Sequence, residues 1–111
     1  DAGWAPHYMY RMDHFYDRHR HWKKLGDMQK LPSEYFAENI YLTFQDDWSA
    51  FQVAHAMNAK RLLWASDFPH SDSTWPWSQE MLERNAVGVT AEERAWILRD
   101  NTAELYKIPV A

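Results

Sequence analysis

The sequence predicts an α/β fold built on parallel strands, and three observations support this prediction. Residues 40–44 and 61–65 are short runs rich in apolar, β-branched and aromatic residues, which is typical of strands. Segments with helical periodicity precede, separate and follow these two runs. The interval between the runs holds one helix, so they form a βαβ unit with parallel strands and a right-handed crossover.

The first expected helix covers residues 5 to about 24. Its apolar residues recur at spacings of three, four or seven and form one stripe: Trp4, Tyr8, Met12, Phe15 and Trp22. Pro6 suits the first turn, and Gly26 follows the last turn as a stop signal. Residues 31–38 then predict a loop with a short helical turn before the first strand.

Asp46 and Asp47 are candidate N-caps for a helix over residues 48–57, in which Phe51, Ala54 and Met57 share one face. Asn58 is a plausible C-cap of that helix. The strand at 61–65 is almost continuously apolar, as expected for a buried parallel strand.

The rest of the chain predicts a loop over residues 66–76 and a helix over residues 77–85, interrupted at Gly88. Thr90 and Glu93 have capping-box spacing and predict a helix through Arg99. Asn101 and Glu104 repeat that spacing and predict a last short helix to Tyr106. Two strands do not make a stable independent sheet, so we expect more protein to pack against this chain.

Composition excludes several function classes. The 111 residues are 46% apolar and 16% aromatic, which is not a disordered composition. A net charge of −4 argues against nucleic-acid binding, and no apolar run is long enough to span a membrane. There is no cysteine, which excludes disulfides and thiolate metal ligands. The absence of targeting signals favours a cytoplasmic protein.

The residues with the clearest chemical potential follow the second strand. Asp67 lies at the carboxyl end of this strand, and Pro69 and His70 follow in the turn. Catalytic groups of α/β barrels occupy this position, where an Asp can bind a divalent metal or accept a proton from metal-bound water. The alternative is that Asp67 only caps a turn through its own backbone, as Asp commonly does before loops that contain Pro.

Several segments in order resemble the ACMSD-like amidohydrolases, the amidohydrolase-2 family. Residues 65–70 (ASDFPH) are similar to the family signature GSDyPH. Residues 3–6 (GWAP) with 11–13 (RMD), 30–44, and 101–106 (NTAELY) resemble the family's motifs around its last strands. The resemblance implies that residues 1–111 are the C-terminal segment of one (β/α)₈ TIM barrel, about the seventh and eighth β/α units with flanking helices.

The resemblance also assigns roles. It implies that Asp67 is a ligand of a catalytic divalent metal, Zn²⁺ in the first place and Mn²⁺ as the alternative. It implies that His70 contacts substrate or supports the site. The family's other ligands, a His-x-His pair and a further His, and its acid/base His lie on strands upstream of this segment. One carboxylate cannot hold a catalytic metal, so we expect the 111 residues alone to be inactive.

The predicted function is therefore that of a metal-dependent hydrolase, or of a decarboxylase, acting on a small carboxylate or cyclic substrate. The activity is expected of the complete protein, which can form a homo-oligomer. The alternative is a non-catalytic module that binds a partner through exposed aromatics. A third hypothesis, metal or nucleic-acid binding by the basic segment 18–24 with His14, is weaker because such a set is usually a solvated face. In a barrel, the helix that contains this basic segment would pack Trp22 inward and place its charges outward. Trp75 and Trp77 either line a pocket or pack under their loop.

Overall fold

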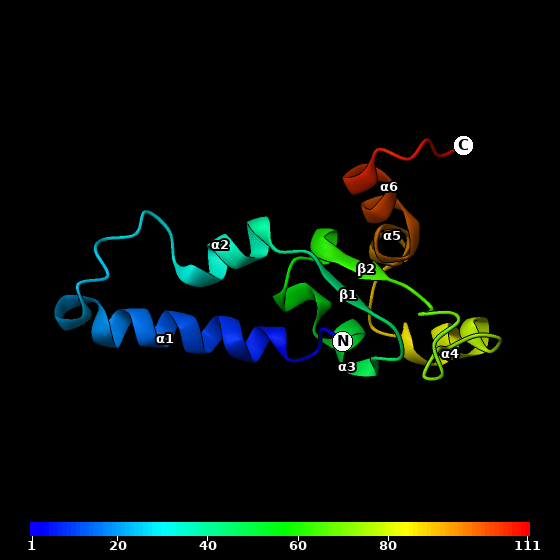
Figure 1. Ribbon diagram of the computed structural model, residues 1–111, viewed down its shortest axis with the longest axis horizontal. Helices are drawn as coiled ribbons and strands as arrows, with labels where there is room; N and C mark the ends of the chain where they lie inside the picture. Colours follow the sequence, from blue (N-terminus) through cyan, green and yellow to red (C-terminus); the bar gives the residue numbers. More distant parts are fainter.

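The computed structural model describes all residues, 1–111, and contains a two-stranded parallel sheet with helices packed around it (Figure 1). Strand β1 (Leu42–Phe44) pairs with β2 (Leu62–Trp64) in parallel, with Thr43 opposite Leu63. The predicted α/β class and the parallel βαβ unit are confirmed. Each strand is shorter than predicted and lies within its predicted run.

The crossover between the strands differs from the single helix expected over residues 48–57. Helix α3 (Trp48–Gln52) is followed by two 3₁₀ helices, η1 (Ala54–Ala56) and η2 (Ala59–Arg61). The expected apolar face is nevertheless buried, because Phe51, Ala54 and Met57 are three residues apart, which is also the 3₁₀ period. Asn58 adopts a positive φ of 79° and caps η2 rather than ending a long helix.

Helix α1 (Ala5–Lys23) and helix α2 (Pro32–Asn39) lie side by side and extend away from the sheet (Figure 1). Asp13 of α1 binds the first turn of α2, since its two carboxylate oxygens accept from Ser33 N at 2.8 Å and Ser33 Oγ at 2.6 Å. This contact gives a physical role to two of the motifs that carry the family resemblance. The expected loop over residues 31–38 is mostly this helix of eight residues, because Pro32 starts it and Asp13 caps it from α1.

The apolar stripe of α1 is largely uncovered in this chain. Trp4, Tyr8 and Phe15 are 46–59% exposed, and Trp22 is 62% exposed. The inward packing expected for Trp22 is therefore not found: its indole contacts only its own helix, with Nε1 3.2 Å from His19 Nδ1. The α1 residues that are buried lie on a neighbouring face: Ala5, Met9 and Tyr16.

The C-terminal part begins with helix α4 (Ser78–Asn85). After a loop, a second and continuous helical stretch is formed by α5 (Ala91–Ala95), the π-helical turn η3 (Trp96–Asp100) and α6 (Asn101–Tyr106). The predicted capping box at Thr90 and Glu93 is confirmed by reciprocal hydrogen bonds of 3.1 and 2.8 Å. The predicted cap at Asn101 is wrong. Asn101 is helical, and its side chain donates to two buried carbonyls, Ala59 O and Leu62 O.

One hydrophobic core joins the sheet, the crossover, the start of α1 and the C-terminal helices. Its largest fully buried side chains are Phe51, Leu62 and Ile97. No helix could cross a membrane: α1 is long enough but not apolar enough, and each of the other helices is too short. The core therefore covers one face of the sheet.

Candidate functional site

The two faces of the sheet have different surroundings. Phe44 is 3% exposed and makes an edge-to-face contact with Phe51 of α3, with ring centroids 5.1 Å apart. Side chains alternate along a strand, so Thr43 projects to the opposite face. The pairing continues past the strands, because Ala65 N donates to Phe44 O at 3.0 Å. The carboxyl ends of β1 and β2 therefore open at one edge, where α/β barrels place their catalytic groups.

Asp67 leaves this edge in an unusual conformation. Its φ is +60°, in the left-handed region that few non-glycine residues adopt and that occurs at turns, at helix caps and at functional sites. The turn after it is closed by the backbone, since His70 N donates to Asp67 O at 2.8 Å. No backbone N–H donates to the Asp67 carboxylate, which does not cap this turn. Asp67 thus closes the turn through its own backbone carbonyl, as in the turn-cap alternative, while its carboxylate is not used by the backbone.

His70 is the side chain in contact with the Asp67 carboxylate. His70 Nδ1 lies 3.2 Å from Asp67 Oδ2, and the two side chains are 66% and 53% exposed. The turn at residues 67–70 brings them together, three positions apart in the sequence. The two residues predicted for the site are thus adjacent and accessible, in an arrangement where the imidazole can orient the carboxylate.

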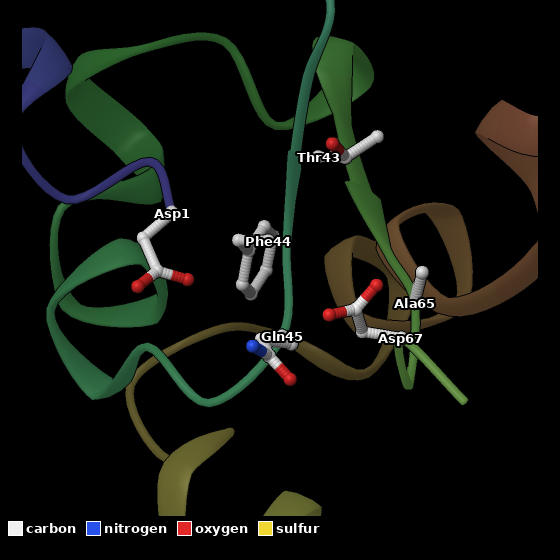
Figure 2. A pocket seen from close by; sticks show the side chains of 6 residues that line it. All are labelled: Asp1, Thr43, Phe44, Gln45, Ala65 and Asp67. Atoms are coloured by element: carbon white, nitrogen blue, oxygen red, sulfur yellow. The ribbon is translucent and has the colours of Figure 1, made fainter. Parts of the chain in front are cut away.

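A pocket of about 240 Å³ lies at this edge of the sheet (Figure 2). Six residues line it: Asp1, Thr43, Phe44, Gln45, Ala65 and Asp67. Figure 2 shows Asp1 and Asp67 on opposite sides of the end of β1. Sequence reasoning missed Asp1 and Gln45. Gln45 follows a strand at the same edge as Asp67, and that position was the signal that could have found it.

Asp47 holds the segment before α1 against the crossover. Its Oδ2 accepts from Ala2 N at 2.8 Å and Gly3 N at 2.9 Å, and its Oδ1 accepts from Ala50 N and the Ser49 hydroxyl. Asp47 is the N-cap of α3, as predicted, whereas Asp46 instead accepts from Asn85 Nδ2. The contact with Ala2 and Gly3 fixes the main chain next to Asp1 at the pocket.

The charge of Asp47 is stabilised although the residue is only 8% exposed. Burial by itself would raise the pKa of Asp47, but the hydrogen bonds from Ser49, Gly3, Ala2 and Ala50 outweigh it and hold the pKa below its usual value of 3.8. Asp47 is therefore an ionised structural anchor behind the pocket and does not line it.

Other predicted candidates lie outside this pocket. Trp75 and Trp77 are 60% and 68% exposed, so neither packs under the loop. Trp77 lines a separate pocket of about 330 Å³ beside α4, and Trp75 contacts Phe68 at 5.0 Å between ring centroids. The structure brings no group of three or more His, Asp or Glu side chains together, on α1 or elsewhere.

Comparison with known proteins places this geometry in a family. The amidohydrolase family model matches residues 2–108. No curated protein sequence matches the chain. The crystal structure of 5-carboxyvanillate decarboxylase LigW from Sphingomonas paucimobilis superposes with a TM-score of 0.78 at 17% identity, over 96% of this chain. The chain spans 31% of that barrel enzyme. Since the family model covers nearly all residues, the chain belongs to the amidohydrolase family.

Proposed function

We propose that these residues are the C-terminal segment of a metal-dependent amidohydrolase barrel, contributing about its seventh and eighth β/α units. The observation that carries the proposal is the placement of Asp67. It follows a parallel strand, has a left-handed backbone conformation, and lines a pocket with a carboxylate that no backbone N–H uses. Strained residues with uncommitted polar groups are concentrated at functional sites.

The residues present fit one part of a metal site. An Asp67 oxygen is a suitable ligand for Zn²⁺ or Mn²⁺, and a catalytic site needs about three protein ligands. We propose that the remaining ligands come from upstream strands of the barrel. A bound divalent ion would polarise a substrate oxygen and lower the pKa of a water molecule. His70 would support this ligand: its Nδ1 lies 3.2 Å from Asp67 Oδ2, close enough to position the carboxylate.

The chemistry follows one of two courses, hydrolysis or non-oxidative decarboxylation. In hydrolysis, Asp67 accepts a proton from the attacking water at the pocket. In decarboxylation, a small carboxylate substrate loses CO₂, and a protonated group supplies the replacing proton. The solved neighbour is a 5-carboxyvanillate decarboxylase, which supports a carboxylate substrate. The exposed aromatic stripe of α1 would suit the alternative, a partner-binding module, but it equally suits contact with the rest of a barrel.

The test is Asp67→Asn in the complete protein, with metal content and turnover as readouts. We expect loss of turnover and a metal affinity lower by about 100-fold, because the amide oxygen is a weaker ligand than the carboxylate. His70→Ala should lower metal affinity by about 10-fold. The matched control is Asp72→Asn, a change at an exposed position of the same loop. Unchanged metal content and turnover in Asp67→Asn would remove Asp67 from the site.

A further inference from the structure

We propose that Gln45 is the substrate-orienting residue of this site, and that its side-chain amide donates a hydrogen bond to a substrate oxygen. The inference rests on the proposed function. It concerns a residue that neither the sequence motifs nor the family resemblance singled out. Gln45 directly follows β1, and it lines the pocket together with Asp67 from the end of β2 (Figure 2).

The backbone of Gln45 is held rigidly. Its carbonyl oxygen accepts from Trp64 Nε1 at 3.0 Å, a bond from β2 back to the end of β1. One residue earlier, Phe44 O accepts from Ala65 N. Gln45 is thus fixed directly after the paired strands, at the edge where it lines the pocket.

The side chain of Gln45, in contrast, does not serve the fold. Its Oε1 is buried and has no hydrogen-bond partner. Leaving a buried acceptor unpaired costs about 1–3 kcal/mol, so structural amides are normally paired. Asn101 illustrates the normal case, since its amide donates to two carbonyls at 2.7 and 2.8 Å. An unpaired amide at a pocket is therefore available for a ligand.

The chemistry of the lining indicates which group Gln45 binds. Asp1 and Asp67 are carboxylates and accept hydrogen bonds when ionised, whereas side-chain donors in the lining come from Gln45 and Thr43. Gln45 Nε2 makes no hydrogen bond with the protein and, unlike Oε1, is not buried, so its N–H groups are available to donate at the pocket. A substrate carboxylate needs such donors for the oxygen that is not directed to the metal. Gln45 supplies one without adding charge beside Asp67.

The experiment measures binding of benzoate, a minimal cyclic carboxylate, to the metal-loaded complete protein by isothermal titration calorimetry. We expect Gln45→Leu to weaken benzoate binding by about 10-fold, the loss typical of a hydrogen bond to a charged acceptor. Gln45→Glu keeps the shape but replaces the donor with a carboxylate, and should weaken binding further. The matched control is Gln52→Leu, because Gln52 lies in α3 and donates to Val87 O, away from this pocket.

The outcomes separate this inference from the proposed function. Metal content should be unchanged in both Gln45 variants, because Gln45 is not proposed as a ligand. Wild-type benzoate affinity in Gln45→Leu and Gln45→Glu, with metal and turnover lost in Asp67→Asn, would overturn the role of Gln45 and leave the proposed function standing. A wild-type protein that holds metal but does not bind benzoate contradicts the carboxylate substrate class, and the role of Gln45 with it. If Gln45→Leu does not fold, the nearly isosteric Gln45→Glu decides.

Discussion

Asp47 offers the sharpest test of how the segment before α1 is held. Asp47→Ala removes the N-cap of α3, which costs about 1 kcal/mol. It also leaves two backbone donors without an acceptor, Ala2 N and Gly3 N. Ala2 is fully buried, so its unpaired N–H costs about 1–3 kcal/mol of stability. Gly3 N is only partly buried and costs less. We expect the free energy of unfolding to fall by about 3–5 kcal/mol, measured by urea unfolding with tryptophan fluorescence at pH 7.

The same residue predicts a pH dependence. The pKa of Asp47 in the folded protein lies below its usual value of 3.8, so its stabilisation is complete above about pH 4. That stabilisation is lost as the pH falls through the folded-state pKa, and the difference between wild type and Asp47→Ala should then shrink. Asp72→Ala, at an exposed loop position, should change stability by no more than about 0.5 kcal/mol. A loss below about 1 kcal/mol in Asp47→Ala, or one independent of pH, would refute this reasoning.

Two further predictions test close contacts. In Gly3→Ala the new Cβ would clash with Ser49 Oγ and lie 2.8 Å from Ser49 Cβ, so we expect a loss of about 1–3 kcal/mol in thermal unfolding. The loss caused by Gly3→Ala should be smaller in a Ser49→Gly background, with Ser49→Gly alone as the reference because it also removes a bond to Asp47; an equal loss in both backgrounds would show that the clash is not the cause. Asn101→Leu removes the buried amide bonds to Ala59 O and Leu62 O, although Ala59 O still accepts from Leu62 N. We expect the free energy of unfolding in urea to fall by about 1–3 kcal/mol, whereas a neutral result would show that these bonds contribute nothing.

Features with a local cause were the ones predictable from the sequence. The two strands lie within the runs expected for them, because buried parallel strands require continuous apolar residues. The capping box at Thr90 and Glu93 formed as predicted, since both partners lie within four residues. Asp67 and His70 were found for the same reason: three positions apart, they meet within one turn. That Asp67 and His70 serve a metal site stays a prediction.

Features with a distant cause were missed. Asn101 has the spacing of a cap, yet its amide is used 39 and 42 positions away in the sequence. Asp47 reaches Ala2, and Asp13 reaches Ser33, through contacts that depend on how α1 lies against its neighbours. The helix expected over residues 48–57 broke into 3₁₀ turns because a spacing of three fits both helix types, and only packing decides between them.

The α/β class, the parallel strand pair and the residues that follow its second strand were predictable from the sequence, because periodicity and composition act over a few neighbouring positions. The set of side chains that share the pocket depends instead on tertiary contacts. Asp1, Gln45 and Asp67 come from three separate segments, and they meet because parallel strands end at one edge of the sheet and Asp47 holds the chain beside them. The exposed stripe on α1 was likewise decided by tertiary contacts, since an apolar face is buried only where a neighbour lies against it.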